Sequence, residues 1–237
     1  MKMNITKKEK IINIVMFLTV LTVGWFYYFS QFMSFDKPAR DGFKAAASVA
    51  FILYCFINLM LTRALIKRKN LRAFCIIMLL GQVFAGAGDI GLNFDFIAGA
   101  VLFAIGHVLF LTAFTVLLRP LPRDFVIALA IIAGAVCLIT FYPGFSFGDV
   151  KIVVYIYAVI ISCMLSKGIS IALTGRMDAH FRLTLLLGTL MFFLSDLMLV
   201  FGMFADVGAI FDFLCLLLYY PAEGFLALSV FESRRLN

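Results

Sequence analysis

The chain is short of charged residues. Of its 237 residues, 14% are Asp, Glu, Lys or Arg, whereas 64% are hydrophobic. Soluble domains carry about 25% charged residues. The mean hydropathy of +1.09 points the same way. This composition excludes a soluble globular protein and predicts an integral membrane protein.

Motifs for metals, disulfides and nucleotides are also missing. The chain has two histidines and five cysteines, and the cysteines fall inside apolar stretches without the paired spacing of a zinc site or a disulfide framework. No glycine-rich phosphate loop follows a strand. We therefore expect neither a metal nor a cofactor. The small residues predict close helix packing instead: Gly81, Ala85, Gly88, Gly99 and Gly106.

Eight apolar runs of about 20 residues are present, each matching the roughly 30 Å hydrocarbon core of a bilayer. They predict one all-α polytopic transmembrane bundle over residues 1–237, with the first run retained because it lacks a small-residue cleavage site. We expect it in a bacterial inner (plasma) membrane. The predicted spans are 11–30, 42–63, 71–93, 96–118, 124–142, 150–173, 181–203 and 207–231.

The net charge is +7, and the Lys and Arg residues that produce it are unevenly distributed along the chain. With the N-terminus inside, 16 of the 20 Lys and Arg residues lie in the first tail, the even-numbered connections and the C-terminus. The positive-inside rule therefore predicts that both termini are cytoplasmic. Contact with anionic membrane lipids accounts for the charge, so no nucleic-acid partner is expected.

A few polar residues lie at membrane depth, where ionisable groups are functional candidates. Asp89 and Asp196 both come late in helices running outward, and Lys44 comes early in one running inward, which places them in one layer. The helical period puts Gln82, Asp89 and Asn93 on one stripe. The remaining members of this set are His107, Tyr157, Ser195, Tyr219, Tyr220 and Glu223.

Structural roles compete with functional ones for most of these residues. Lys44 can extend its amine to the interface, Tyr219 or Tyr220 can simply pack, and His107 is as well explained by an interhelical hydrogen bond. For the two aspartates a functional role is favoured, because isolated carboxylates so deep in a membrane are rare.

Four segments carry a family resemblance. "AGAGDIGL" contains Asp89, "GAVLFAIGHVLFLTAF" contains His107, "GTLMFFLSDLMLV" contains Asp196, and "YYPAE" ends at Glu223. In order and spacing they resemble the YhhN family of lysoplasmalogenase-like membrane proteins. Lys44 in "GFKAAAS" matches a family lysine as well. Two departures are Pro221, which interrupts the last segment, and Glu223, where the family usually has Gln.

The resemblance implies hydrolysis of the vinyl ether bond of lysoplasmalogens to a fatty aldehyde and glycerophosphocholine or glycerophosphoethanolamine. A low-dielectric site with two carboxylates keeps one protonated as the acid while its partner stays ionised. Asp89 and Asp196 are the expected catalytic pair, and which one is the acid stays open. Substrate-binding or supporting roles are expected for Lys44, Asn93, His107, Tyr157, Ser195, Tyr219, Tyr220 and Glu223.

We expect the pair at one pocket in the outward half of the membrane, roughly 5–10 Å apart, with an apolar groove for the tail of a lysophospholipid. No protein partner can be inferred. The alternative is a non-enzymatic lipid-binding protein or a proton-coupled transporter that uses the same carboxylates. A metal held by Asp89, Asp196, His107 and Glu223 is a minor alternative, and a purely structural protein would leave both aspartates unexplained.

Overall fold

The computed structural model describes residues 6–236, and within them the chain forms eight long α-helices. Each is long and apolar enough to span a membrane, which confirms the predicted all-helical bundle of eight helices. The helices end within a few residues of the ends predicted for the spans. Short 3-10 turns precede α6, at Gly148–Val150, and follow α8, at Ser233–Leu236. The helices are α1 (Lys7–Ser30), α2 (Lys37–Arg63), α3 (Lys69–Gly91), α4 (Phe96–Leu117), α5 (Pro122–Phe141), α6 (Lys151–Ala172), α7 (Ala179–Phe204) and α8 (Ile210–Glu232).

Short polar caps set where several of these helices begin. The Thr6 hydroxyl accepts a hydrogen bond from the Glu9 N–H, and the Glu9 carboxylate accepts one from the Thr6 N–H. Asp36, Asp95 and Asp178 cap α2, α4 and α7 through their side-chain oxygens. Such caps satisfy first-turn N–H groups that have no partner within the helix.

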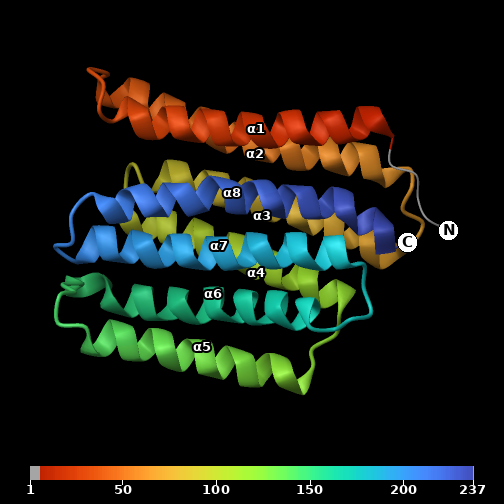
Figure 1. Cartoon of the computed structure of the whole chain (residues 1–237). Helices are drawn as coiled ribbons and strands as arrows, with labels where there is room; N and C mark the ends of the chain where they lie inside the picture. Colours follow the sequence, from red (N-terminus) through yellow and green to blue (C-terminus); the bar gives the residue numbers. More distant parts are fainter. Residues whose placement is uncertain (1–5, 237) are drawn as a thin grey trace.

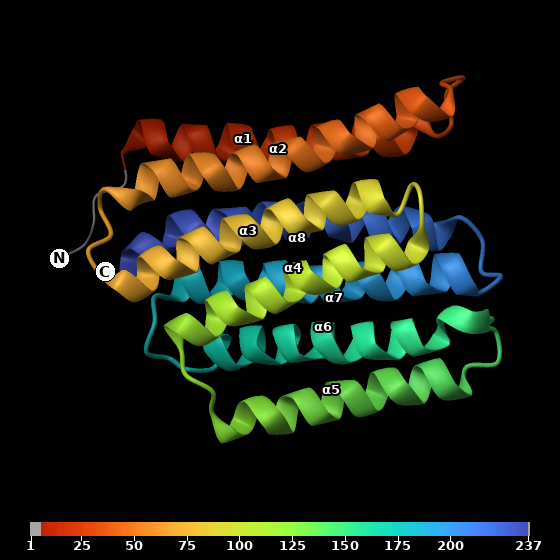
Figure 2. The ribbon, with the colours of Figure 1, turned by 180° about the vertical axis from the view of Figure 1, so that it is seen from behind.

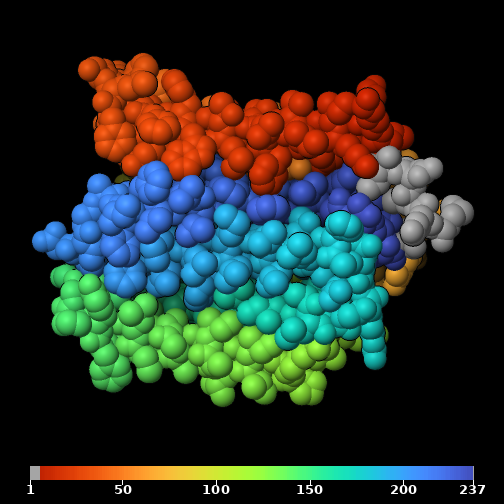
Figure 3. All heavy atoms as spheres, viewed as in Figure 1, coloured from red at the N-terminus to blue at the C-terminus, as the bar shows by residue number. Residues whose placement is uncertain are grey.

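Consecutive helices run up and down in a bundle, and both described ends of the chain lie at the same end of it (Figure 1). α8 lies in the middle and packs against α1, α2, α3 and α7. Seen from behind, α3 and α4 cross in front of α8 and α7 (Figure 2). α1 and α5 form opposite edges, and the space-filling view shows their side chains bounding that face (Figure 3).

The outer face of α5 carries large apolar side chains, because it faces lipid rather than protein. Phe125, Val126 and Leu129 are each 69% exposed. The inner face of α5 is fixed to α6 by charge: Lys167 Nζ donates to Asp124 Oδ2 over 2.6 Å and to the Arg119 carbonyl oxygen over 3.0 Å. Lys167 is 2% exposed, and a buried charge of this kind must be paired to be tolerated.

Small residues let α3 and α4 approach closely, as the sequence predicts. A side chain added at Gly106 would meet the carbonyl oxygen of Gly81, and one added at Gly99 would overlap Leu92. On the other side of α3, Gly86 faces Ser48 and Ile52 of α2. These contacts bring three backbones together around Asp89, which lies near the end of α3 remote from the chain termini.

We predict that a reporter fused after Asn237 lies in the cytoplasm, because the basic residues concentrate at the end of the bundle that holds both described chain ends. A chain truncated at Phe94, between α3 and α4, should place the same reporter on the outer side. Paired alkaline phosphatase and fluorescent protein fusions read out both positions. Phosphatase activity from the fusion after Asn237 would contradict the assigned orientation.

Candidate functional site

Asp89 is held by two hydroxyl groups from other helices. Its Oδ2 atom accepts a hydrogen bond from Ser48 Oγ of α2 over 2.7 Å and from Tyr219 Oη of α8 over 2.9 Å. Asp89 is 4% exposed. A carboxyl group buried among apolar side chains needs such donors, since burial removes the water that would otherwise bind it. The stripe predicted on α3 therefore faces the protein interior.

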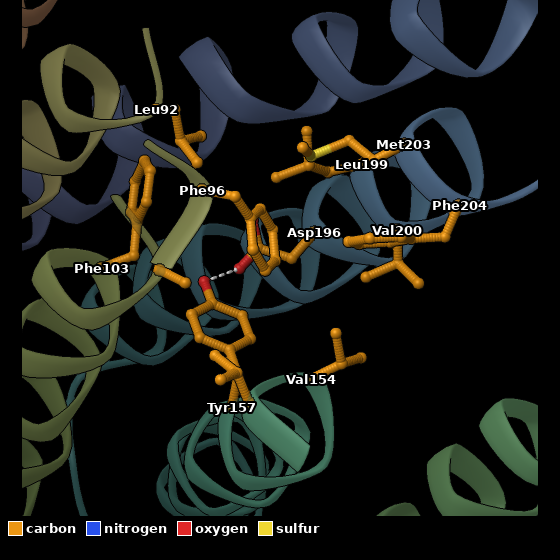
Figure 4. Close-up of a pocket in the computed structure, with 12 residues that line it drawn as sticks. Leu92, Phe96, Phe103, Val154, Tyr157, Asp196, Leu199, Val200, Met203 and Phe204 are labelled. Atoms are coloured by element: carbon orange, nitrogen blue, oxygen red, sulfur yellow. Dashed lines mark hydrogen bonds between the residues drawn. The ribbon is translucent and has the colours of Figure 1, made fainter. Parts of the chain in front are cut away.

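Asp196 has a matching pair of partners on two further helices. Its Oδ2 atom accepts from Tyr157 Oη of α6 over 2.5 Å, as drawn in Figure 4, and lies 3.2 Å from Nε2 of His107 on α4. His107 Nε2 is also 2.7 Å from Tyr157 Oη. Both contacts with the aspartate therefore involve the same oxygen, Oδ2.

The His107 ring has a preferred hydrogen position. Its Nδ1 atom is buried without a hydrogen-bond partner among the described residues. Buried N–H groups are left unpaired more rarely than acceptors, so a hydrogen on Nε2 is the better arrangement. His107 then donates toward Asp196 and Tyr157 and fixes their orientation.

The two aspartates line one cavity of about 280 Å³. Lys44 from α2 supplies the positive charge on its wall, and its amine donates to Asn93 Oδ1 over 3.1 Å. The cavity lies in the half of the bundle remote from the chain termini, which agrees with the depth expected for this layer. It reaches that end of the molecule beside Gln31, just after α1, and Asp212, early in α8.

Two small apolar clefts share Asp196 with this cavity as a lining residue. The first runs between α4, α6 and α7, and Figure 4 shows Phe103 on one side of the aspartate and Val200 on the other. The second runs between α5, α6 and α7, past Ile139. Asp196 lines all three spaces, whereas Asp89 lines only the cavity. Asp196 therefore stands between the polar cavity and the two apolar clefts.

Most residues expected at the site come together. Lys44, Asp89, Ser195, Asp196 and Tyr219 line the cavity, and Asn93, His107 and Tyr157 contact members of that set. The Ser195 hydroxyl donates to the Cys215 carbonyl oxygen over 3.0 Å and so ties α7 to α8.

Tyr220 and Glu223 lie behind this wall rather than on it. Glu223 is fully buried, and neither of its carboxyl oxygens has a hydrogen-bond partner in the described structure. Gln82 of α3 donates from Nε2 to the Glu223 backbone carbonyl over 3.2 Å, while its own Oε1 is unpaired. Their proposed supporting roles remain predictions.

The sequence analysis did not identify three residues of the site. They are Ser48, which donates to Asp89, and Tyr27 and Gln31, which line the cavity. Ser48 lies one helical turn after Lys44, and Gln31 one turn after Tyr27, so each pair shares a helix face. That spacing was the available signal. Within residues 6–236, no three His, Cys, Asp or Glu side chains form a cluster suited to a metal ion.

Comparisons with known proteins place the sequence in a family. The sequence model of the YhhN family matches residues 39–230. A curated relative, "Lysoplasmalogenase TMEM86A" of Bos taurus, is 31% identical over 160 residues, and the match spans 65% of this chain and 65% of the bovine protein. No solved structure matched the chain.

We predict that Glu223→Gln raises the midpoint of thermal unfolding. The new amide can donate to the unpaired Oε1 of Gln82, and the partnerless carboxyl group is removed. A gain of about 1 kcal/mol corresponds to about 2–4 °C for a chain of this size. Glu223→Leu is the control, because it removes the carboxyl group without pairing Gln82. A midpoint for Glu223→Gln below that of the wild type would contradict the interpretation.

Proposed function

The chain belongs to the YhhN family, and on that premise we propose that it is a lysoplasmalogenase, which hydrolyses the vinyl ether bond of a single-chain ether phospholipid. The products are a fatty aldehyde and a water-soluble glycerophosphodiester. The curated name of the bovine relative and the geometry of the two aspartates support this assignment.

The observation that carries the proposal is the convergence of Asp89 and Asp196 on one cavity that also has a cation and adjoining apolar clefts. Hydrolysis of a vinyl ether needs one acid and one carboxylate near the same two carbon atoms. A lysophospholipid also needs a place for its phosphate and a place for its single tail. The described cavity and clefts supply each of these requirements.

The place where the substrate fits distinguishes the roles of the two carboxyl groups. Lys44 attracts the phosphate as a point charge at the polar side of the cavity. The tail follows an apolar cleft past Asp196, because both clefts begin there. This orientation places the alkene carbon nearer the tail beside Asp196 and the ether-bonded carbon nearer Asp89.

The surroundings of the two aspartates differ in polarity. Asp196 faces the apolar clefts and the ring of Phe103, where the tail and the alkene carbon beside it lie in this orientation. Asp89 shares the cavity with Lys44 and accepts hydrogen bonds from Ser48 and Tyr219. We therefore assign Asp196 as the acid and Asp89 as the carboxylate.

The reaction then proceeds in three balanced steps. Asp196 gives its proton to the alkene carbon nearer the tail, which leaves an oxocarbenium ion at the ether-bonded carbon. Water adds to that carbon while Asp89 accepts a proton from it, giving a hemiacetal. The hemiacetal collapses: its hydroxyl proton is lost, the carbon–oxygen bond to glycerol breaks, the glycerol oxygen takes up a proton, and the aldehyde leaves. Proton transfer from Asp89 through water restores Asp196.

We predict that the purified protein releases aldehyde from a vinyl ether lysophospholipid but leaves its ester-linked acyl counterpart intact, because protonation requires the alkene. Asp89→Asn and Asp196→Asn should each lower kcat/KM by at least about 100-fold, the usual contribution of a proton-transferring side chain. Aldehyde is measured by coupling to an NADH-dependent alcohol dehydrogenase.

The matched control is Asp149→Asn, the same change at the same end of the bundle in the turn before α6, away from the cavity. It should retain wild-type turnover. Unfolding midpoints of all three variants show whether they remain folded. Wild-type rates in either cavity variant would remove that aspartate from the mechanism, and no aldehyde from the wild type would refute the proposed activity.

A second prediction distinguishes the role of Asp196 as the acid from the role of Asp89 as the carboxylate. Formate is ionised at neutral pH, so it can replace a missing carboxylate but not a missing acid. Adding formate should therefore restore at least part of the activity of Asp89→Ala, which leaves room for the ion, and should leave Asp196→Ala inactive. Rescue of Asp196→Ala alone would reverse the assignment.

A further inference from the structure

A second polar cavity lies at the opposite end of the bundle, beside the chain termini. It has a volume of about 360 Å³ and is bounded by the start of α3, the end of α4, the α6–α7 connection and the 3-10 turn after α8. We call it the arginine cavity, because three arginines line it. They are Arg68, Arg176 and Arg235.

The arginine cavity has an excess of positive charge. Asp178 is the acidic residue in its lining, and its Oδ1 atom already accepts from the N–H groups of His180 and Phe181 as the cap of α7. Arg235 pairs with Glu232, and its Nε atom also lies 3.9 Å from Asp178 Oδ1. Arg176 forms no ion pair or hydrogen bond with any residue from 6 to 236, so its guanidinium is available to an external anion.

The first turn of α3 adds to the positive electrostatic potential of the arginine cavity. Arg68 is the residue before the first turn, and its side chain does not cap the helix. Asn70 and Leu71 of that turn line the cavity, and the positive end of the dipole of this 23-residue helix is directed there. Arg68 itself donates one hydrogen bond to the Leu236 carbonyl oxygen over 3.0 Å, which holds the guanidinium at the cavity.

From this charge, volume and geometry we propose that the arginine cavity binds a phosphate group. Guanidinium groups match phosphate oxygens with paired, charge-assisted hydrogen bonds. A free phosphate and the headgroup of an anionic phospholipid present the same chemistry. Leu117, Leu118 and Met177 on the wall provide an apolar surface on which the glycerol and first methylenes of a lipid can lie.

Two titrations of the full-length protein in zwitterionic micelles distinguish the two sources. One adds sodium phosphate against sodium chloride at equal ionic strength, and the other adds phosphatidylglycerol against phosphatidylcholine. We expect a saturable rise in the unfolding midpoint with at least one phosphate source. A rise with inorganic phosphate identifies a site for the free anion, and a rise with phosphatidylglycerol alone identifies a lipid headgroup site. No rise with either overturns the proposal.

Arg176→Gln tests the location of the site, because this residue lies in a connection and supports no contact in the fold. It should weaken the apparent Kd about tenfold or more, as expected from loss of a charged hydrogen-bond donor. Arg63→Gln at the same end of the bundle is the control, since Arg63 is exposed and does not line the cavity. An equal Kd for Arg176→Gln and Arg63→Gln would overturn the assignment to this cavity.

Discussion

The cost of keeping carboxyl groups in a low-dielectric interior governs this structure. Each cavity aspartate accepts hydrogen bonds from two other helices, so Asp89 joins α3 to α2 and α8, and Asp196 joins α7 to α4 and α6. Six of the helices are thereby fixed around two carboxyl groups. α1 and α5 stand outside these hydrogen bonds and occupy the edges of the bundle (Figure 1). Other polar contacts tie them to their neighbours: Tyr54 of α2 donates to Asn13 of α1, and Lys167 of α6 pairs with Asp124 of α5.

The two groups of three helices have different interiors. The group around Asp89 contains Lys44, Ser48 and Asn93, and it is polar. In the group around Asp196, Phe192 packs 4.7 Å from His107 between ring centroids, and apolar clefts open beside the aspartate. Under the proposed function, a molecule with a charged head and a hydrocarbon tail has one favourable orientation across this boundary, and that orientation sets the position of the reacting bond.

The sequence was sufficient for the helices because apolar length reports membrane spans directly. It also predicted that Asp89 and Asp196 share a layer, since depth depends only on their position along each span. It could not show that Ser48 and Tyr219 would bind Asp89, because partners are decided by how helices are rotated and which helices are neighbours. For the same reason, the position of Glu223 behind the cavity wall was not predictable from its helix face alone.

The arginine cavity illustrates a further limit. Arg68, Arg176 and Arg235 were counted in the sequence as residues of the inner side, which explains their abundance but not their convergence. Arg68 and Arg176 come from two connections and Arg235 from the 3-10 turn after α8, and only the packing of α3, α4, α7 and α8 brings these segments together. The rule that predicts topology therefore says nothing about which inner-side cations form a site.

The central place of α8 has a consequence for biogenesis. Membrane helices enter the bilayer in the order of their synthesis and then associate. Tyr219 follows Asp89 by 130 residues, so Asp89 is in the membrane for the synthesis of five further helices before its tyrosine partner arrives. Until α8 inserts between α1, α2, α3 and α7, the cavity lacks one wall. A chain interrupted before α8 leaves Asp89 embedded in the membrane without that tyrosine.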